Sequence, residues 1–106
     1  MGLTYTVYLE PEVHDLRRTL PGNVRQRIRR VFDSLEQTPR PPDSRPLALA
    51  ADVLPEGIEI HRIRLERWRI VYAVNDAERW VRVLGIYRRP PYDYGDLAEL
   101  AARVSP

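Results

Sequence analysis

The sequence contains no cysteine, no lysine and no long apolar run, and these absences limit what the protein can be. Without cysteine, neither a disulfide framework nor a thiol nucleophile is available. No segment approaches the roughly 18 to 20 apolar residues of a membrane span, and the chain opens without a signal-peptide pattern. We therefore expect a cytoplasmic protein.

The absence of lysine has a chemical consequence of its own. All 17 basic residues are arginine, although the formal net charge is only +2. Coding bias is the simplest explanation for this usage. The planar guanidinium suits bidentate contacts with phosphate and stacking on bases, but it keeps its proton at physiological pH. No side-chain amine can therefore serve as a general base.

The length and apolar content predict one small domain. The chain has 106 residues, of which 43% are hydrophobic, enough for a single core and too many for a disordered chain. We see no internal repeat and no sign of a second domain. A single domain spanning residues 1–106 is the prediction.

Three consecutive runs rich in Ile, Val, Tyr and Trp predict β-strands, because these side chains pack well on a pleated surface. The runs are Gly57–Leu65, Trp68–Val74 and Arg79–Tyr87. The connections are too short for the crossovers that parallel neighbours require. The runs therefore predict an antiparallel meander.

Alternation along these strands predicts which residues share a face of the sheet. We assume that Arg64 pairs with Arg69 across the first turn and Asn75 with Glu78 across the second. The core face then holds Ile63, Leu65, Trp68, Ile70, Tyr72, Val74, Val81 and Val83. The opposite, arginine-bearing face holds Arg62, Arg64, Arg69, Val71, Trp80, Arg82 and Leu84. A register slip of one residue would bury the arginines.

The remaining segments complete an α+β pattern. Leu3–Glu10 alternates like a strand, a first helix begins at Pro11, and a second begins with Asn23 as its cap. The proline-rich segment Thr38–Gly57 reads as a loop, and Asp96–Val104 as a terminal helix. The prediction is an α+β fold: an N-terminal strand, a helical hairpin, a three-stranded antiparallel meander and a C-terminal helix, with helices over one sheet face.

Four segments together resemble one family, the RelE/ParE toxins of bacterial type II toxin–antitoxin pairs. They read LEPEVHDLRRTLPGNVRQRI, LEQTPRPPDSRPL, HRIRLERWRIVYAV and VLGIYRRPPYDY, in this order along nearly the whole chain. The RelE-like branch is the closer one. The resemblance implies a fold like that of small microbial ribonucleases.

The resemblance also implies a function and a site. RelE-like members are metal-independent endoribonucleases that cut messenger RNA on the ribosome, inhibit translation and arrest growth. The implied catalytic residues are Arg69, Arg89 and Tyr94, or Tyr92 with a small shift in alignment. The implied RNA-binding and phosphate-binding residues are Arg62, Arg64 and Arg88, and the shared face adds Arg82 and the aromatic Trp80.

The resemblance predicts neither a cofactor nor a metal. The chain has two histidines, His14 and His61, and they lie far apart on different predicted elements. Alternation places His61 on the face opposite Arg62, where a core or rim role is expected.

One departure from the family pattern concerns proton transfer. RelE-like enzymes carry lysines on the strand where this chain has Arg62 and Arg64, and arginine is a poor general base. The proton must then pass to Tyr92, Tyr94, His61, an acidic residue, or the substrate and ribosome.

Three functions therefore stay open at this stage. The first is a ribosome-dependent nuclease, with messenger RNA and the ribosome as partners. The second is a ParE-like inhibitor of DNA gyrase without nuclease chemistry, and the third is an inactive toxin-fold binding protein. For the first two, an acidic cognate antitoxin is the expected partner.

Overall fold

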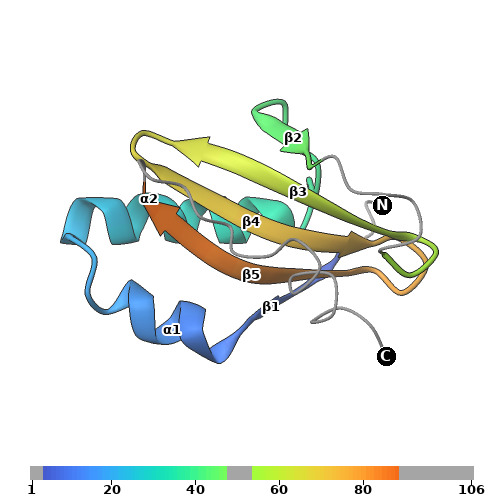
Figure 1. Ribbon diagram of the computed structural model, residues 1–106, viewed down its shortest axis with the longest axis horizontal. Coiled ribbons are helices and arrows are strands. Elements are labelled where there is room, and N and C mark those ends of the chain that lie inside the picture. Colours follow the sequence, from blue (N-terminus) through green and yellow to red (C-terminus); the bar gives the residue numbers. More distant parts are fainter. Residues whose placement is uncertain (1–3, 48–53, 89–106) are drawn as a thin grey trace.

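The computed structural model describes residues 4–47 and 54–88 of the chain. Its helices are α1 (Pro11–Arg17) and α2 (Gly22–Leu35), and its strands are β1 (Thr6–Leu9), β2 (Ser44–Pro46), β3 (Ile58–Leu65), β4 (Trp68–Asn75) and β5 (Trp80–Arg88). In this part of the chain the strands form one five-stranded sheet in the order β1-β5-β4-β3-β2 (Figure 1). Neither described helix is long and apolar enough to cross a membrane.

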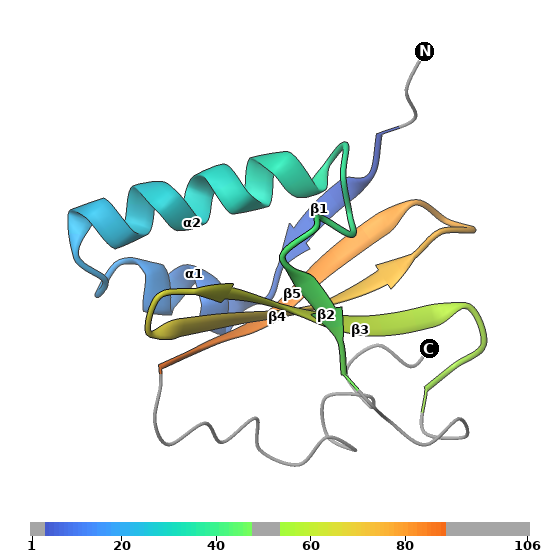
Figure 2. The same cartoon turned by 90° about the horizontal axis from the view of Figure 1, so that it is seen from above.

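Both helices pack on the same face of the sheet (Figure 2), which we call the helix face. The apolar side of α2 is buried there through Val24, Ile28, Phe32 and Leu35. Their spacing gives one continuous stripe along a helix, and that stripe covers the apolar side chains of β4 and β5. The α+β architecture predicted from the sequence is confirmed for these elements. The opposite face of the sheet is the far face.

The predicted meander is confirmed, and its first hairpin has the expected register. Leu65 pairs with Trp68 and Arg64 with Arg69. Such a two-residue turn needs a left-handed residue, and Glu66 supplies it with φ of 55°. Glu66 also forms an ion pair with Arg27 of α2, which ties this turn to the helix.

The second hairpin differs from the prediction. Asn75 pairs with Trp80 rather than with Glu78. The side chain of Asn75 accepts a hydrogen bond from the backbone N–H of Glu78 at 3.0 Å, so this asparagine organises a four-residue turn. The register error is an even number of residues, so the predicted faces of β4 and of the first half of β5 are unchanged.

A β-bulge in β5 changes the faces beyond it. The pairing shifts between Tyr72, which lies opposite Val83, and Val71, which lies opposite Gly85. Leu84 is therefore an extra residue on β5, and alternation restarts after it. Tyr87 consequently lies on the far face opposite Arg69.

The far face carries more apolar residues than the sequence prediction, which places only Val71, Trp80 and Leu84 among its arginines. Ile60, Val71, Ala73 and Leu84 are buried on it and form a second apolar cluster. The physical reason is that the central positions of this face are apolar, and the arginines stand around them.

Three further predictions need comment. The helix α2 begins at Gly22 with Pro21 as its N-cap, so Asn23 is not the cap. The short strand β2 lies inside the segment predicted as a loop, where it pairs with β3. It is an edge strand, which is where a strand accepts a proline such as Pro46. The predicted helix Asp96–Val104 lies outside the described residues.

We predict that Gly85→Ala displaces the ring of Tyr87. A Cβ at Gly85 would lie 2.6 Å from the Tyr87 hydroxyl oxygen and 2.7 Å from a ring carbon. Overpacking of this kind costs about 1–3 kcal/mol of unfolding free energy. Urea unfolding should show this loss in the wild-type background and a much smaller one in Tyr87→Ala.

Gly22→Ala is the matched control, because the nearest atom to its added Cβ is 3.9 Å away on Arg25. Since alanine is the better helix former, this variant should be neutral or slightly stabilised. An equal cost of Gly85→Ala with and without the Tyr87 ring would contradict the prediction.

Candidate nucleic-acid interface

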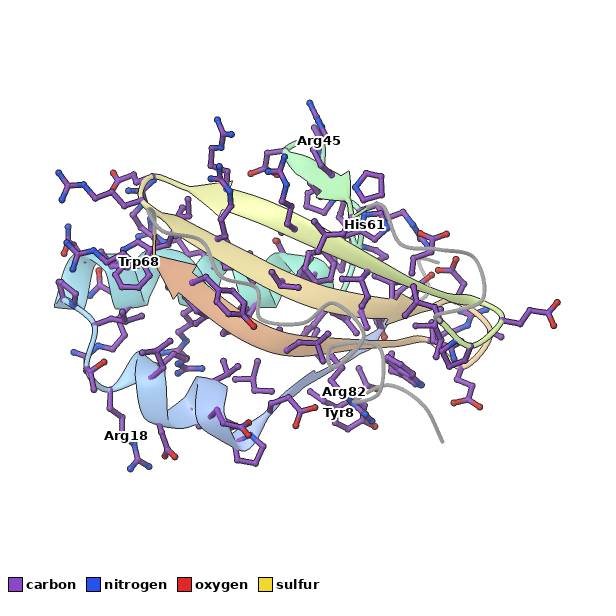
Figure 3. The ribbon with its side chains drawn as sticks, in the orientation of Figure 1. Tyr8, Arg18, Arg45, His61, Trp68 and Arg82 are labelled. Carbon is purple, nitrogen blue, oxygen red and sulfur yellow. The ribbon has the colours of Figure 1, made fainter. Side chains whose placement is uncertain are left out.

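Two cross-strand pairs of arginines lie at one end of the far face. Arg45 of β2 pairs with Arg62 of β3, and Arg64 of β3 pairs with Arg69 of β4. Like charges directly opposite each other on adjacent strands destabilise a sheet. These four arginines come from three neighbouring strands and concentrate positive charge on one part of the sheet, despite the cost in sheet stability. Concentrated positive charge is what a phosphate-binding surface needs. Figure 3 shows Arg45 projecting beside β2.

No ion pair with the described residues neutralises three of these arginines, Arg45, Arg62 and Arg64. Arg45 and Arg64 are exposed and Arg62 is half-buried. Within residues 4–47 and 54–88, neither Arg62 nor Arg64 forms an ion pair. No described strand places an acidic side chain on the far face, since Glu59 belongs to the helix face.

Arg69 differs from its neighbours because only 4% of its surface is exposed. The sequence predicts its position on the face away from the helices, and the register agrees. From that position alone, truncation of Arg69 would be expected to leave the fold intact. Burial argues against that expectation, because removing a buried side chain also removes packing.

Arg82 and Trp80 lie at the other end of the far face and contact each other. The Arg82 guanidinium carbon is 5.1 Å from the centre of a Trp80 ring, within the range of a cation–π contact. The indole N–H of Trp80 donates a hydrogen bond of 3.0 Å to the Glu78 carboxylate. The ring of Trp80 is thereby fixed in orientation, and it also packs against the second apolar cluster.

The structure does not bring Arg88 to this surface. The bulge at Leu84 places Arg88 opposite Trp68, whose ring packs against the core on the helix face. Arg88 there lines a pocket with Leu20 and Val24. The predicted residues Arg89, Tyr92 and Tyr94 lie outside the described residues, so their roles stay predictions.

Sequence reasoning missed two residues of the far face. Arg45 was assigned to a loop, although a proline-containing segment is compatible with an edge strand. Tyr87 lies opposite Arg69 because of the bulge, and its ring crosses Gly85. A glycine inside a strand pattern is the signal that could have predicted both the bulge and this close approach.

His61 lies on the helix face, as the sequence predicts, and is only 5% exposed. Its Nε2 is 2.7 Å from the Glu59 carboxylate, and its ring stacks on that of Tyr72 with centroids 5.9 Å apart. His61 is therefore separated from Arg62 and Arg64 by the sheet itself. This placement removes it from the candidates for proton transfer at the arginines.

A chain of polar contacts extends from Glu59 to the N-terminal strand. Arg40 binds Glu59 at 3.0 Å and Asp76 at 2.8 Å, and the Tyr5 hydroxyl donates to Asp76 at 2.6 Å. The Arg40 hydrogen bond holds the pKa of Asp76 below its ordinary value, and the bonds from His61 and Arg40 do the same for Glu59. These contacts fasten the segment after α2 to the sheet.

In the described part of the chain, no three side chains among His, Cys, Asp and Glu gather as metal ligands would. His14 lies on α1 and His61 on β3. The chemistry that the far face offers is therefore the fixed positive charge of guanidinium groups beside aromatic rings.

Comparison with solved structures identifies the fold. The chain is similar to a chain of the archaeal RelE–RelB complex from Pyrococcus horikoshii, with 25% identity and a TM-score of 0.73 over 84% of this chain and 99% of that one. The chain has the RelE/ParE toxin fold. No family model and no curated protein matches the sequence.

Two further RelE-fold structures show the same likeness. The toxin–antitoxin complex RelBE2 of Mycobacterium tuberculosis gives a TM-score of 0.62 at 20% identity, over 81% of this chain and 99% of that one. The isolated RelE toxin of E. coli gives 0.64 at 19% identity, over 95% and 99%. The resemblance inferred from the sequence is thus confirmed at the level of the RelE/ParE fold.

We predict that Tyr72 makes the fold sensitive to alkaline pH. Its ring is fully buried, its hydroxyl donates to the backbone oxygen of Pro39 at 2.9 Å, and burial raises its pKa from 10.0 to about 12. Above pH 10 the unfolded state loses this proton first, so the folded state binds more protons and stability falls as pH rises. The fall should reach about 2 kcal/mol by about pH 12.

Urea unfolding from about pH 9 to about pH 12 measures this effect. Tyr72→Phe should be less stable near neutral pH by about 0.5–1.5 kcal/mol, because the hydrogen bond is lost. It should also lose most of the alkaline fall, and a smaller fall should remain because the hydrogen bond to Asp76 raises the pKa of Tyr5 as well. Tyr8→Phe, which alters an exposed ring, should keep the full fall. The same alkaline fall in Tyr72→Phe would refute the assignment.

Proposed function

We propose that this protein is the toxin of a prokaryotic toxin–antitoxin pair and acts as a ribosome-dependent endoribonuclease on messenger RNA. Solved structures of RelE toxins and of RelE–RelB complexes share its fold, and this supports the toxin role. The nuclease activity is the finer part of the proposal. It is supported by the residues of the far face.

The observation that carries the proposal is the pairing of Arg45 with Arg62 and of Arg64 with Arg69. Cross-strand pairs of like charge weaken the sheet that contains them, so a structural role alone does not account for them. A bound phosphate backbone would relieve the repulsion. Single-stranded RNA offers both phosphates and bases that are free to stack.

The chemistry needs stabilisation of charge more than covalent participation by the protein. The ribose 2′-oxygen attacks the adjacent phosphorus, the bond to the next nucleotide's 5′-oxygen breaks, and a 2′,3′-cyclic phosphate forms. One proton leaves the 2′-hydroxyl and another reaches the departing oxygen. Negative charge develops on the phosphoryl oxygens, and fixed guanidinium groups such as those of Arg62 and Arg64 stabilise it and hold the backbone in line.

The proton transfers need groups other than these arginines, because arginine does not give up its proton. His61 lies on the helix face and is not available to them. The proposal therefore assigns proton transfer to Tyr94 or Tyr92, or to the ribosome, and assigns charge stabilisation to the arginines, with Arg69 and Arg89 in the catalytic set.

Inhibition of DNA gyrase is the second candidate. The observation that favours it is the presence of Arg62 and Arg64 where RelE-like enzymes have lysines, since loss of an amine base suits a toxin without nuclease chemistry. The two candidates differ in one assay. A gyrase inhibitor blocks supercoiling in vitro and leaves translated messenger RNA intact.

We predict that Arg62→Ala together with Arg64→Ala lowers cleavage of translated messenger RNA by about 10²-fold or more, as expected for losing charged contacts to the transition state. Neither side chain belongs to an apolar cluster, so the melting temperature should stay near the wild-type value. Cleavage is measured by primer extension in a reconstituted translation reaction.

The matched control is Arg18→Ala together with Arg25→Ala, which removes the same charge from exposed positions next to and on the helices. Equal losses in the two double variants would mean that total charge matters and the far face does not. Arg69→Ala is the poorer probe because Arg69 is buried.

A cognate antitoxin follows from the same surface. An acidic, partly disordered chain folding over the arginines would neutralise them and block access to RNA. We predict that the product of an adjacent gene co-purifies with this protein and restores growth when both are expressed. Isolation of this protein alone from its native operon, with no rescue by either neighbouring gene, would contradict the prediction.

A further inference from the structure

Tyr8 is a large apolar side chain left in solvent on an otherwise well-buried sheet. It is 50% exposed, and it is the one exposed large hydrophobic residue in the described part of the chain. Its neighbours Val7 and Leu9 pack into the core on the helix face, so alternation places Tyr8 on the far face. A single exposed tyrosine on an edge strand is ordinary by itself, and its meaning depends on what surrounds it.

The surroundings of Tyr8 contain a fixed cation and a second ring. Tyr8 pairs with Arg82 across β1 and β5, and Figure 3 shows the two side by side. Arg82 in turn stacks on Trp80, whose indole N–H is held by Glu78. The Arg82 guanidinium therefore has the Tyr8 ring beside it across the two strands and the Trp80 ring beside it along β5. We call Tyr8, Arg82 and Trp80 the stacking patch.

This composition matches one class of ligand. Single-stranded nucleic acid is bound without sequence readout by aromatic rings on which bases stack, interleaved with cations that contact phosphate. A duplex would not present its base faces to these rings. The stacking patch therefore fits unpaired nucleotides.

Continuity with the arginine pairs supports the same occupant. Arg82 lies opposite Ala73 and Tyr87 lies opposite Arg69, both on the far face of β4. Four residues separate Ala73 from Arg69, so the patch stands roughly 13 Å along the strand from the arginine pairs. The described strands place no acidic side chain on this face between them. Among the described strands, RNA lying across this face would meet apolar and positive side chains, and the Glu78 carboxylate stands in the turn beside Trp80.

We propose that Tyr8, with Arg82 and Trp80, forms a second nucleotide subsite that holds an unpaired base of the RNA away from the arginine pairs. The inference deepens the proposed function and rests on it for the identity of the strand as messenger RNA. It extends the binding surface to β1, an edge strand to which the sequence pattern assigns no site.

Fluorescence anisotropy of the full chain with a labelled single-stranded RNA oligonucleotide tests the proposal. Tyr8→Ala should weaken binding by about 5-fold to 100-fold, the range measured for loss of one stacked base. Tyr8→Phe keeps the ring and should bind like the wild type. Because Tyr8 carries no charge, the dependence on salt should stay unchanged, whereas Arg82→Ala should lower its slope by about 0.7.

An oligonucleotide of the same length with abasic sites separates stacking from other effects. On it, Tyr8→Ala and the wild type should bind equally. The proposal is overturned if the wild type does not bind single-stranded RNA, if Tyr8→Ala binds the normal oligonucleotide as the wild type does, or if its loss is as large on abasic RNA. It is also overturned if Tyr8→Ala impairs only binding of the antitoxin, which would make the patch a protein interface.

Failure of the nucleotide subsite and failure of the proposed nuclease function give different results in these experiments. If cleavage of translated messenger RNA is absent while Tyr8-dependent binding of RNA persists, the nuclease proposal fails and the subsite stands. If cleavage depends on Arg62 and Arg64 while Tyr8→Ala changes neither binding nor cleavage, the subsite fails alone. Thermal melting of Tyr8→Ala should match the wild type, since the ring is exposed.

Discussion

The burial of β4 on both faces is the constraint on which the rest of the structure depends. Its residues from Arg69 to Val74 are all buried. On the helix face its side chains meet α1 and α2, and on the far face Val71 and Ala73 form part of the second apolar cluster. Because β4 is the central strand, its position fixes the registers of β3 and β5, and through them those of β2 and β1. Every arginine on the far face is placed relative to it.

The bulge at Leu84 shows how one extra residue divides a functional surface. Arg82, which precedes the bulge, lies on the far face. After the bulge, Tyr87 lies on the far face and Arg88 lies on the helix face. A regular strand would have placed Ile86 opposite Arg69 and would have kept Arg88 on the far face. The bulge therefore puts an aromatic ring in place of an isoleucine next to Arg69, and Gly85 provides the space in which that ring lies.

The sequence predicts the meander and its faces well, because hydrophobic alternation is strong there. Ile63, Ile70 and Val81 are buried as predicted, and an error of two residues in the second turn preserved the assignment. The bulge could not be predicted from alternation, since Leu84 is apolar and fits either face. Strand β2 was missed because three residues containing a proline carry no periodicity. Long-range pairing, rather than local preference, makes it a strand.

The difference between local sequence pattern and long-range pairing also explains which parts of the candidate site could be predicted. Alternation on β3 predicted that Arg62 and Arg64 share a face, whereas Arg45 joins them only through the pairing of β2 with β3. The burial of Arg69 was also out of reach, because the extent to which neighbours cover a side chain is a tertiary property. A surface that looks like one arginine stripe in the sequence is, in the fold, two basic ends flanking an apolar centre.

The use of arginine in the basic part of the far face has a consequence for its chemistry. Charge on a guanidinium is permanent, so the arginine pairs can bind and stabilise phosphate at any physiological pH but cannot take part in proton transfer. A site in which lysines are replaced by arginines therefore separates two tasks. In the proposed nuclease, the phosphate is held by β2, β3 and β4, where the sheet fixes Arg45, Arg62, Arg64 and Arg69 in register. Moving protons falls to groups that are not on those strands. If the protein is the proposed nuclease, substitution of the arginines should change transition-state binding without altering the pH dependence of the reaction, because a guanidinium takes no part in proton transfer.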